Sequence, residues 1–198
     1  MVTDRKICFF NSCKSWGGGE KWHCDMAGRL SAKGYDVWVV TNPGTPLAAR
    51  LDGQALNLIP VRVSKFSFLN PFKILKLRNI FVKAGIRTIV LNLPSDLKAG
   101  GIAAKLAGVE KIIYRRGSAK PIKNTPFNRY LFRCIIDCVI ANSQATRNTI
   151  LKNNPDLIEE SKIHIIYNGL DLERYDALKT DPARFSRESE IVLGTAGR

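Results

Sequence analysis

Short apolar runs alternate along the chain with longer stretches in which apolar and charged positions recur at helical spacing. Seven of these runs are rich in valine, isoleucine and aromatic residues, and we predict a strand in each of them. The predicted strands cover residues 6–11, 36–41, 56–61, 87–91, 111–114, 137–141 and 162–166. Their apolar residues are nearly continuous and do not alternate with polar ones, which is typical of parallel strands buried on both faces.

Amphipathic stretches between these runs predict helices over residues 20–33, 46–52, 71–84, 95–107 and 126–133. Ser95 and Ser143 are expected to cap helix starts, and Gly34, Gly85 and Gly108 stand where helices should end. Strand and helix alternate without hairpin signals. The pattern therefore predicts an α/β fold: a Rossmann-like, doubly wound parallel sheet of about seven strands with helices on both faces.

From about residue 171 onwards the sequence becomes mostly polar and charged. We expect a Rossmann-like domain over residues 1–170, a polar interdomain linker over 171–190, and the first strand of a second domain over 191–198. An apolar run followed by GTAGR cannot complete a domain. The expectation is that the chain is a fragment in which a second domain has just begun.

Composition fits a globular protein, with 45% hydrophobic and 24% charged residues, but the charge is unevenly placed. Between Arg62 and Arg147 there are 17 lysines and arginines and three acidic residues, which accounts for the whole net charge of +14. Such a segment attracts phosphate groups of a nucleic acid, an anionic lipid surface or a substrate. No apolar stretch has the length of a membrane span or a signal peptide, so we expect a cytoplasmic protein, peripheral at the inner face of the membrane.

The five cysteines are odd in number and irregularly spaced, so free thiols are expected. Cys13, His23 and Cys24 lie close together in sequence, but no second cluster of ligands accompanies them, and no metal site is predicted. His23 falls in a predicted helix and His164 in a predicted strand, neither beside a recognisable nucleophile.

Three consecutive glycines, Gly17, Gly18 and Gly19, follow the first predicted strand and precede a helix that begins near Glu20. Backbone amides without Cβ obstruction at a helix N-terminus favour a phosphate or another anion. A dinucleotide fingerprint does not fit, because Trp22 occupies the place of its third glycine. Glu20 is expected to interact favourably with the helix dipole and not to act as a catalytic acid. The alternative is a flexible loop without a ligand.

Arg115, Arg116 and Ser118 follow the fifth predicted strand, where substrate groups converge in open parallel sheets. A guanidinium fork binds two oxygens of a phosphate or carboxylate at once, and it cannot act as a general base. A solvated basic loop is the alternative.

Two further strand exits carry turn and cap signals, and one helix is both basic and apolar. Asn168, Gly169 and Asp171 are expected to form a hinge.

The helix predicted at 71–83 could bind an anionic membrane surface, because it is both basic and apolar. The alternative is an ordinary outer helix of the sheet.

The glycine loop, the motif IANS at 140–143, YNGLD at 167–171 and the closing GTAGR together resemble glycosyltransferases of family 4. The resemblance implies one half of a GT-B enzyme that transfers a sugar from a nucleotide-sugar, usually with retention of configuration and without a metal or other cofactor. This half would hold the acceptor, a glycan or lipid-linked molecule of cell-surface polysaccharide or lipopolysaccharide synthesis. The missing half would hold the donor, and the fragment alone is expected to be inactive.

The resemblance also assigns roles to residues. It brings Gly17, Gly18 and Gly19 near the donor diphosphate and places YNGLD at the interdomain hinge. Many members carry a histidine or aspartate where this chain has Arg116, so Arg116 becomes the candidate catalytic position. Arg115 and Arg116 together are expected to grip an anionic acceptor or the departing phosphate. Two alternatives stay open: a nucleotide-sugar epimerase with the same two-domain plan, and a basic nucleic-acid-binding domain.

Overall fold

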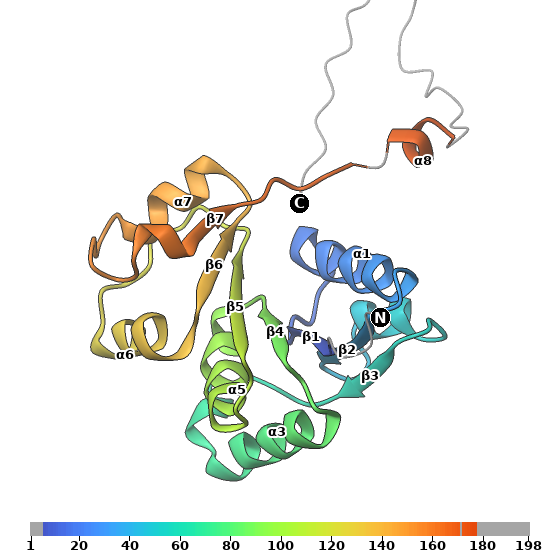
Figure 1. The fold of residues 1–198 in the computed structure, drawn as a ribbon, viewed down its shortest axis with the longest axis horizontal. Helices are drawn as coiled ribbons and strands as arrows, with labels where there is room; N and C mark the ends of the chain where they lie inside the picture. The colour runs from blue at the N-terminus through green and yellow to red at the C-terminus, as the bar shows by residue number, and fades with distance from the viewer. Residues whose placement is uncertain (1–5, 171, 178–198) are drawn as a thin grey trace, which may run out of the picture. The chain divides into compact units, whose positions relative to one another are not determined.

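The computed structural model describes residues 6–170 and 172–177, and the chain divides into two compact units at Asn168 and Gly169 (Figure 1). In the second unit the described residues form one short helix, α8 (Leu172–Asp176). The predicted linker lies largely outside the described residues, and the strand predicted at 191–193 lies wholly outside them. The proposed domain division therefore stays a prediction.

The first unit is built on a sheet of seven parallel strands, which confirms the predicted fold class. The strands are β1 (Lys6–Asn11), β2 (Asp36–Thr41), β3 (Asn57–Pro60), β4 (Thr88–Leu91), β5 (Lys111–Arg116), β6 (Cys138–Ala141) and β7 (Ile163–Ile165). Their order in the sheet is β3-β2-β1-β4-β5-β6-β7, so the chain reverses its direction of growth between β1 and β4. Ligands of open α/β sheets bind at such a switch point, outside the carboxyl ends of the strands.

Helices connect the strands. They are α1 (Gly18–Ala32), α2 (Pro46–Leu51), α3 (Pro71–Ala84), α4 (Pro94–Asp96), α5 (Ile102–Leu106), α6 (Pro126–Tyr130) and α7 (Gln144–Leu151). Two 3₁₀ turns, η1 (Ser67–Leu69) and η4 (Glu160–Lys162), and two π-helical turns, η2 (Leu97–Gly101) and η3 (Leu131–Ile135), complete the described unit.

The sheet buries apolar side chains on both of its faces. In β1, Phe9 packs in a core with residues of α1 and α2, whereas Cys8 and Phe10 face a larger core that contains residues of α3 and α5. Figure 1 shows α1 and the α3–α5 pair on opposite sides of the sheet. Successive side chains of a strand point to opposite faces, so a strand covered on both faces must be apolar at every position.

Most helix ends follow the predicted signals. The Asn70 side chain accepts a hydrogen bond from the Lys73 amide at 3.1 Å, and Gly85 ends α3 in the left-handed conformation at φ 65°. Ser143 caps α7 through the Thr146 amide, also at 3.1 Å. The prediction that Ser95 is a helix cap was wrong: the helix begins at Pro94, one residue before it.

The helix that follows β4 includes a π-helical turn, and it lies very close to the sheet there. A Cβ added at Gly100 would stand 3.0 Å from the Leu91 side chain and 3.1 Å from Phe10. A Cβ at Gly101 would stand 3.1 Å from Ile135. The two glycines therefore permit an approach that larger residues would prevent.

Candidate functional site

Polar side chains gather at the carboxyl ends of the central strands. β1 ends at Asn11, Asn92 directly follows β4, and Arg115 is the penultimate residue of β5. Because the strands are parallel and adjacent, these residues share one edge of the sheet. Asn11 is fully buried and Arg115 is only 3% exposed, so this polar cluster is part of the packed structure.

Glu20, in the first turn of α1, connects the helix to this cluster. Its Oε1 accepts hydrogen bonds from the side-chain amides of Asn11 at 3.3 Å and Asn92 at 3.2 Å. Asn92 in turn accepts a hydrogen bond from the Arg115 guanidinium at 3.4 Å. Glu20 is only 5% exposed, and these two amides supply the hydrogen bonds that its buried carboxylate needs. In return the carboxylate fixes the orientation of both side-chain amides.

The Arg115 guanidinium is held on several sides. It lies 4.8 Å from the centre of the Trp22 ring, in a cation–π contact, and it donates to the Asn168 side chain at 3.4 Å. Burial lowers the pKa of Arg115, and the charge of Glu20 opposes that shift. An arginine stays protonated under these conditions, so the site contains a fixed and partly desolvated cation.

Two glycines allow this cluster to assemble. A Cβ on Gly19 would lie 2.9 Å from the Asn92 amide nitrogen, and a Cβ on Gly117 would lie 2.9 Å from the Arg115 guanidinium. Such separations are too short for a carbon atom. Gly19 therefore has a packing role, in addition to the ligand-binding role that its sequence suggests.

The other two glycines of the loop leave the start of α1 open. Gly17 is the N-cap residue of α1 and offers no side chain to the helix amides, and a Cβ on Gly18 would meet nothing within 4 Å. The amides of the first turn are therefore accessible from the side of Gly18. They carry the positive end of the dipole of a 15-residue helix.

The structure separates the two arginines that the sequence placed side by side. β5 continues two residues further than predicted, and Arg115 and Arg116 pair with Ile140 and Ala141 of β6. As neighbours in a strand they point to opposite faces of the sheet. Arg116 turns back onto its own loop, where it donates to the backbone carbonyl of Ser118 at 3.3 Å.

The two arginines therefore have different contacts. Arg116 also donates to the carbonyl of Lys120 and lies 6.0 Å from the Tyr114 ring, so it organises the loop after β5. Ser118 contributes its backbone oxygen to this arrangement and is itself exposed. Arg115 is the arginine that lies beside the glycine loop.

Of the predicted hinge residues, Asn168 contacts the polar cluster through Arg115. Gly169 begins the second compact unit, and a Cβ there would meet nothing within 4 Å. Asp171 lies outside the described residues. The hinge assignment stays a prediction.

A second polar cluster was missed by sequence reasoning. The Asp96 carboxylate accepts hydrogen bonds from the Ser12 amide at 3.2 Å and the Leu93 amide at 2.8 Å, and also from the Ser12 hydroxyl. Burial raises the pKa of Asp96 to about 7, against the effect of these hydrogen bonds. The pairing of Ser12 with Asp96 spans 84 residues, and no local motif in the sequence indicates it.

His23 is buried beside this edge of the sheet, but its surroundings do not suit a role as a general base. Its ring packs against Phe9 and Trp22, with centroid distances of 5.4 and 5.3 Å, and within the described part of the chain neither ring nitrogen has a hydrogen-bond partner. Burial lowers the pKa of His23 to about 3, and the charge of Arg115 adds to the effect. His164 is exposed on β7.

The cysteines are all free. Cys8 and Cys138 are buried in strands, whereas Cys134 is exposed in η3. Among residues 6–170 and 172–177, no group of three or more histidine, cysteine or acidic residues is placed to bind a metal.

An apolar and basic surface lies at the start of α3. Phe66, Leu69 and Phe72 are 62%, 67% and 81% exposed, and Lys73 and Lys76 follow on the helix. Within the described residues no helix has the length and hydropathy needed to cross a bilayer.

Comparison with models of known protein families finds a match. The model for Glycosyltransferase Family 4 matches residues 16–174. A search among curated proteins finds no match.

Solved structures share the fold. A glycosyltransferase from Rickettsia africae superposes with a TM-score of 0.75 at 21% identity, over 90% of this chain and 47% of its own. HepE from Anabaena, in complex with UDP and glucose, superposes with a TM-score of 0.69 at 20% identity, with the same coverage of both chains. The chain thus spans about half the length of these structures and corresponds to one half of the GT-B fold, as predicted.

The same half-fold occurs in a different class of enzyme. The UDP-GlcNAc 2-epimerase from Neisseria meningitidis, bound to UDP-GlcNAc, superposes with a TM-score of 0.57 at 11% identity, over 81% of this chain and 45% of its own. Fold alone therefore does not separate transferase from epimerase.

Proposed function

The chain belongs to glycosyltransferase family 4, and on that basis we propose that it forms the acceptor-side half of an enzyme that transfers a sugar from a nucleotide-sugar to a glycan or lipid-linked acceptor. A second domain, comparable to the other half of the solved relatives, would hold the donor. The observation that carries the proposal is the fixed cation Arg115, held beside the open start of α1 at the switch point of the sheet.

Glycosyl transfer separates a sugar from a diphosphate, and negative charge grows on the departing oxygen. Preorganised donors aimed at that oxygen lower the barrier, because they need no rearrangement as the charge develops. Arg115 and the first amides of α1 are such donors. Glu20 and Asn92 hold the guanidinium in place, and Trp22 covers one face of it.

We assign the phosphate-binding role to Arg115 and a loop-ordering role to Arg116. Arg115 faces α1, whereas Arg116 donates to carbonyl oxygens of its own loop. UDP in the HepE complex supports a uridine nucleotide as one candidate donor. Retention of configuration and the absence of a metal or other cofactor are part of the proposal, taken from family resemblance.

The test is a transfer assay on the protein that carries both halves. A panel of nucleotide-sugars and acceptors is screened for nucleotide release and, by mass spectrometry, for glycosylated product. Arg115→Gln should lower kcat about 100-fold, the usual effect of removing one such donor. Arg116→Gln carries the same charge change and should cost far less. Equal activity of Arg115→Gln and wild type would exclude the assigned role.

The epimerase remains the second candidate because its fold matches this chain. It predicts that a nucleotide-sugar is consumed without any glycosylated acceptor. Product analysis in the same assay separates the two reactions.

For the acceptor we propose a membrane-associated molecule, with the enzyme at the inner surface of the cell membrane in polysaccharide or lipopolysaccharide synthesis. Exposed Phe72 and Leu69 suit insertion among headgroups, and Lys76 suits anionic lipid. Phe72→Ser should reduce flotation with anionic liposomes. Tyr130→Ser, which removes an exposed aromatic side chain from α6, should not. Failure to float with either anionic or neutral lipid would remove the membrane part of the proposal.

A further inference from the structure

A pocket of about 410 Å³ opens at the other end of the same sheet edge, beyond the carboxyl ends of β1, β2 and β3. Its lining includes Lys14 from the loop after β1, Arg62 from the segment after β3, and Lys73 from the first turn of α3. Among the residues that the structure describes, no acidic side chain lines it. Three separate segments of the chain thus bring cations to one cavity without a described carboxylate beside them.

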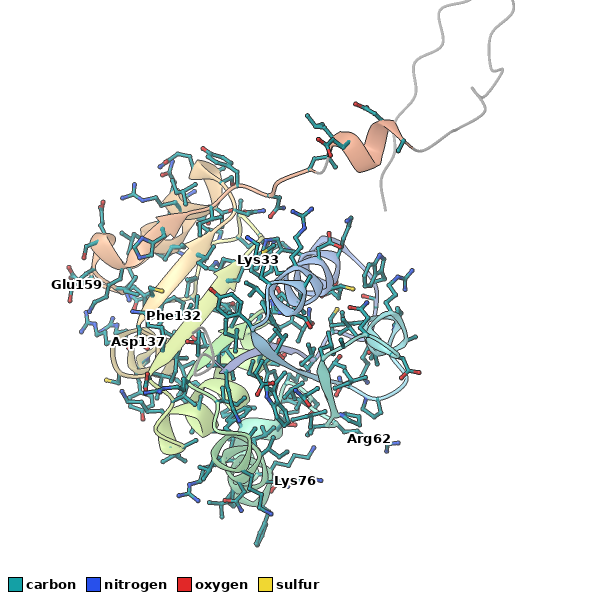
Figure 2. All side chains as sticks on the ribbon, turned by 45° about the vertical axis from the view of Figure 1, so that its right-hand side comes forward. Lys33, Arg62, Lys76, Phe132, Asp137 and Glu159 are labelled. Atoms are coloured by element: carbon teal, nitrogen blue, oxygen red, sulfur yellow. The ribbon has the colours of Figure 1, made fainter. Side chains whose placement is uncertain are left out.

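Two of these cationic side chains have no hydrogen-bond or ion-pair partner among the described residues. Within residues 6–170 and 172–177, no hydrogen bond or ion pair engages the Lys14 ammonium or the Arg62 guanidinium. The Arg62 side chain extends away from the body of the protein (Figure 2). Lys73 donates to the Ser67 hydroxyl at 3.3 Å, which leaves two of its three hydrogens for a ligand.

The backbone that surrounds the pocket is fixed by a buried asparagine. Asn42 donates to the carbonyls of Ser12 at 2.6 Å and Val63 at 3.1 Å, and it accepts from the Val63 amide at 2.6 Å. The loops after β1, β2 and β3 are therefore joined through one side chain. A rigid frame with free cations at its rim is preorganised for an anion.

We propose that this pocket binds a phosphate or carboxylate group on a sugar-sized ligand, with Arg62 and Lys14 as its principal contacts. The volume lies in the range of small-molecule sites and exceeds what an isolated phosphate needs. The guanidinium fork of Arg62 matches two oxygens of such a group. If the proposed transferase function holds, the ligand is the acceptor, which would then be anionic.

The position of the pocket fits that assignment. Lys14 belongs to the same β1–α1 loop as Gly17, so one loop contributes both to the pocket and to the start of α1. Ser12, in the same loop, joins the frame of the pocket to the Asp96 cluster: its carbonyl accepts from Asn42 and its amide donates to Asp96. An acceptor anchored at Arg62 could thus extend along the sheet edge towards the donor phosphate.

The experiment is a titration of the ¹⁵N-labelled chain with inorganic phosphate, glucose 1-phosphate and, as the uncharged counterpart, glucose, at constant ionic strength. Saturable shifts are expected at the amides of residues 42–45 and 62–64 with the two phosphates only. Arg62→Gln or Lys14→Gln should raise the Kd about tenfold, in line with the loss of one charged hydrogen bond. Lys76→Gln removes a positive charge from the neighbouring face of α3, outside the pocket lining, and should change the Kd less than about twofold.

Each outcome decides the proposal. Equal weakening by Lys76→Gln would attribute binding to the general field of the basic segment and overturn it. Shifts confined to Gly17–Gly19 and Arg115, or no saturable shifts, would also overturn it. Because no donor is present, failure here is separate from failure of the transfer assay. In that assay Arg62→Gln should raise the KM for a phosphorylated acceptor and leave kcat within about twofold of wild type.

Discussion

Replacing His23 tests whether α1 buries this imidazole away from water beside the polar cluster, because burial makes the free energy of unfolding depend on pH. The ring is enclosed by Phe9 and Trp22, and neither nitrogen is hydrogen-bonded within the described residues. Burial therefore lowers its pKa from 6.5 to about 3. The folded protein keeps His23 neutral over that interval, whereas the unfolded chain takes up a proton.

The sign and size of the effect follow from this difference. The contribution of His23 to stability is fully present above pH 6.5 and is lost progressively as the pH falls towards 3. Each pH unit within the interval costs about 1.4 kcal/mol, so about 2 kcal/mol is lost between pH 7 and pH 5. That is a large part of the total free energy of unfolding, which is about 5–15 kcal/mol for a typical domain.

Urea unfolding followed by circular dichroism, at pH 7 and pH 5, measures this loss as the difference between wild type and a variant without His23. His23→Leu keeps the apolar packing and removes the titrating group, so its stability should fall about 2 kcal/mol less than that of wild type. Other titrating groups, Asp96 among them, are present in both proteins and cancel in the difference. His164→Leu removes the exposed histidine on β7 and should retain the acid loss, because His23 is still there. Equal losses in wild type and His23→Leu, within about 0.5 kcal/mol, would refute the argument.

Three further predictions test the site and the fold. Gly19→Ala should destabilise the protein by about 1–2 kcal/mol, because its Cβ would displace an amide 2.9 Å away, whereas Gly18→Ala, with open space around it, should raise Tm slightly. For Asp96, with a pKa raised from 3.8 to about 7, the contribution of this one carboxyl to stability should rise as the pH falls from 7 towards 4, so in denaturant titrations over that range Asp96→Asn should lose more stability than wild type. Asn70→Ala removes the cap of α3 and should cost about 1 kcal/mol in thermal unfolding.

Much of the fold could be predicted because local signals and the tertiary structure agree. The bounds of β1, β2 and α3 match the predicted ranges. In α3, for example, Pro71 marks the start and Gly85 the end, and each acts through its own backbone geometry. Such signals need no knowledge of distant residues.

The site was predicted in part. Gly19 and Arg115 were placed at the correct edge of the sheet, because that edge follows from the order of strands and helices alone. The separation of Arg115 from Arg116 could not be foreseen, because it depends on β5 continuing two residues further along β6. Asp96 was missed as a partner of Ser12 for a similar reason, since the two meet only after the sheet has formed.

The central place of β1 in the sheet has a consequence for synthesis of the protein. Among the strands of this sheet β1 leaves the ribosome before the others, yet one of its two neighbours, β4, begins only at Thr88. Until that segment emerges, Cys8, Phe9 and Phe10 present an apolar strand with one unpaired backbone edge. The nascent chain therefore passes through an interval in which its future core is exposed, and chaperone capture should be strongest before β4 has emerged from the ribosome.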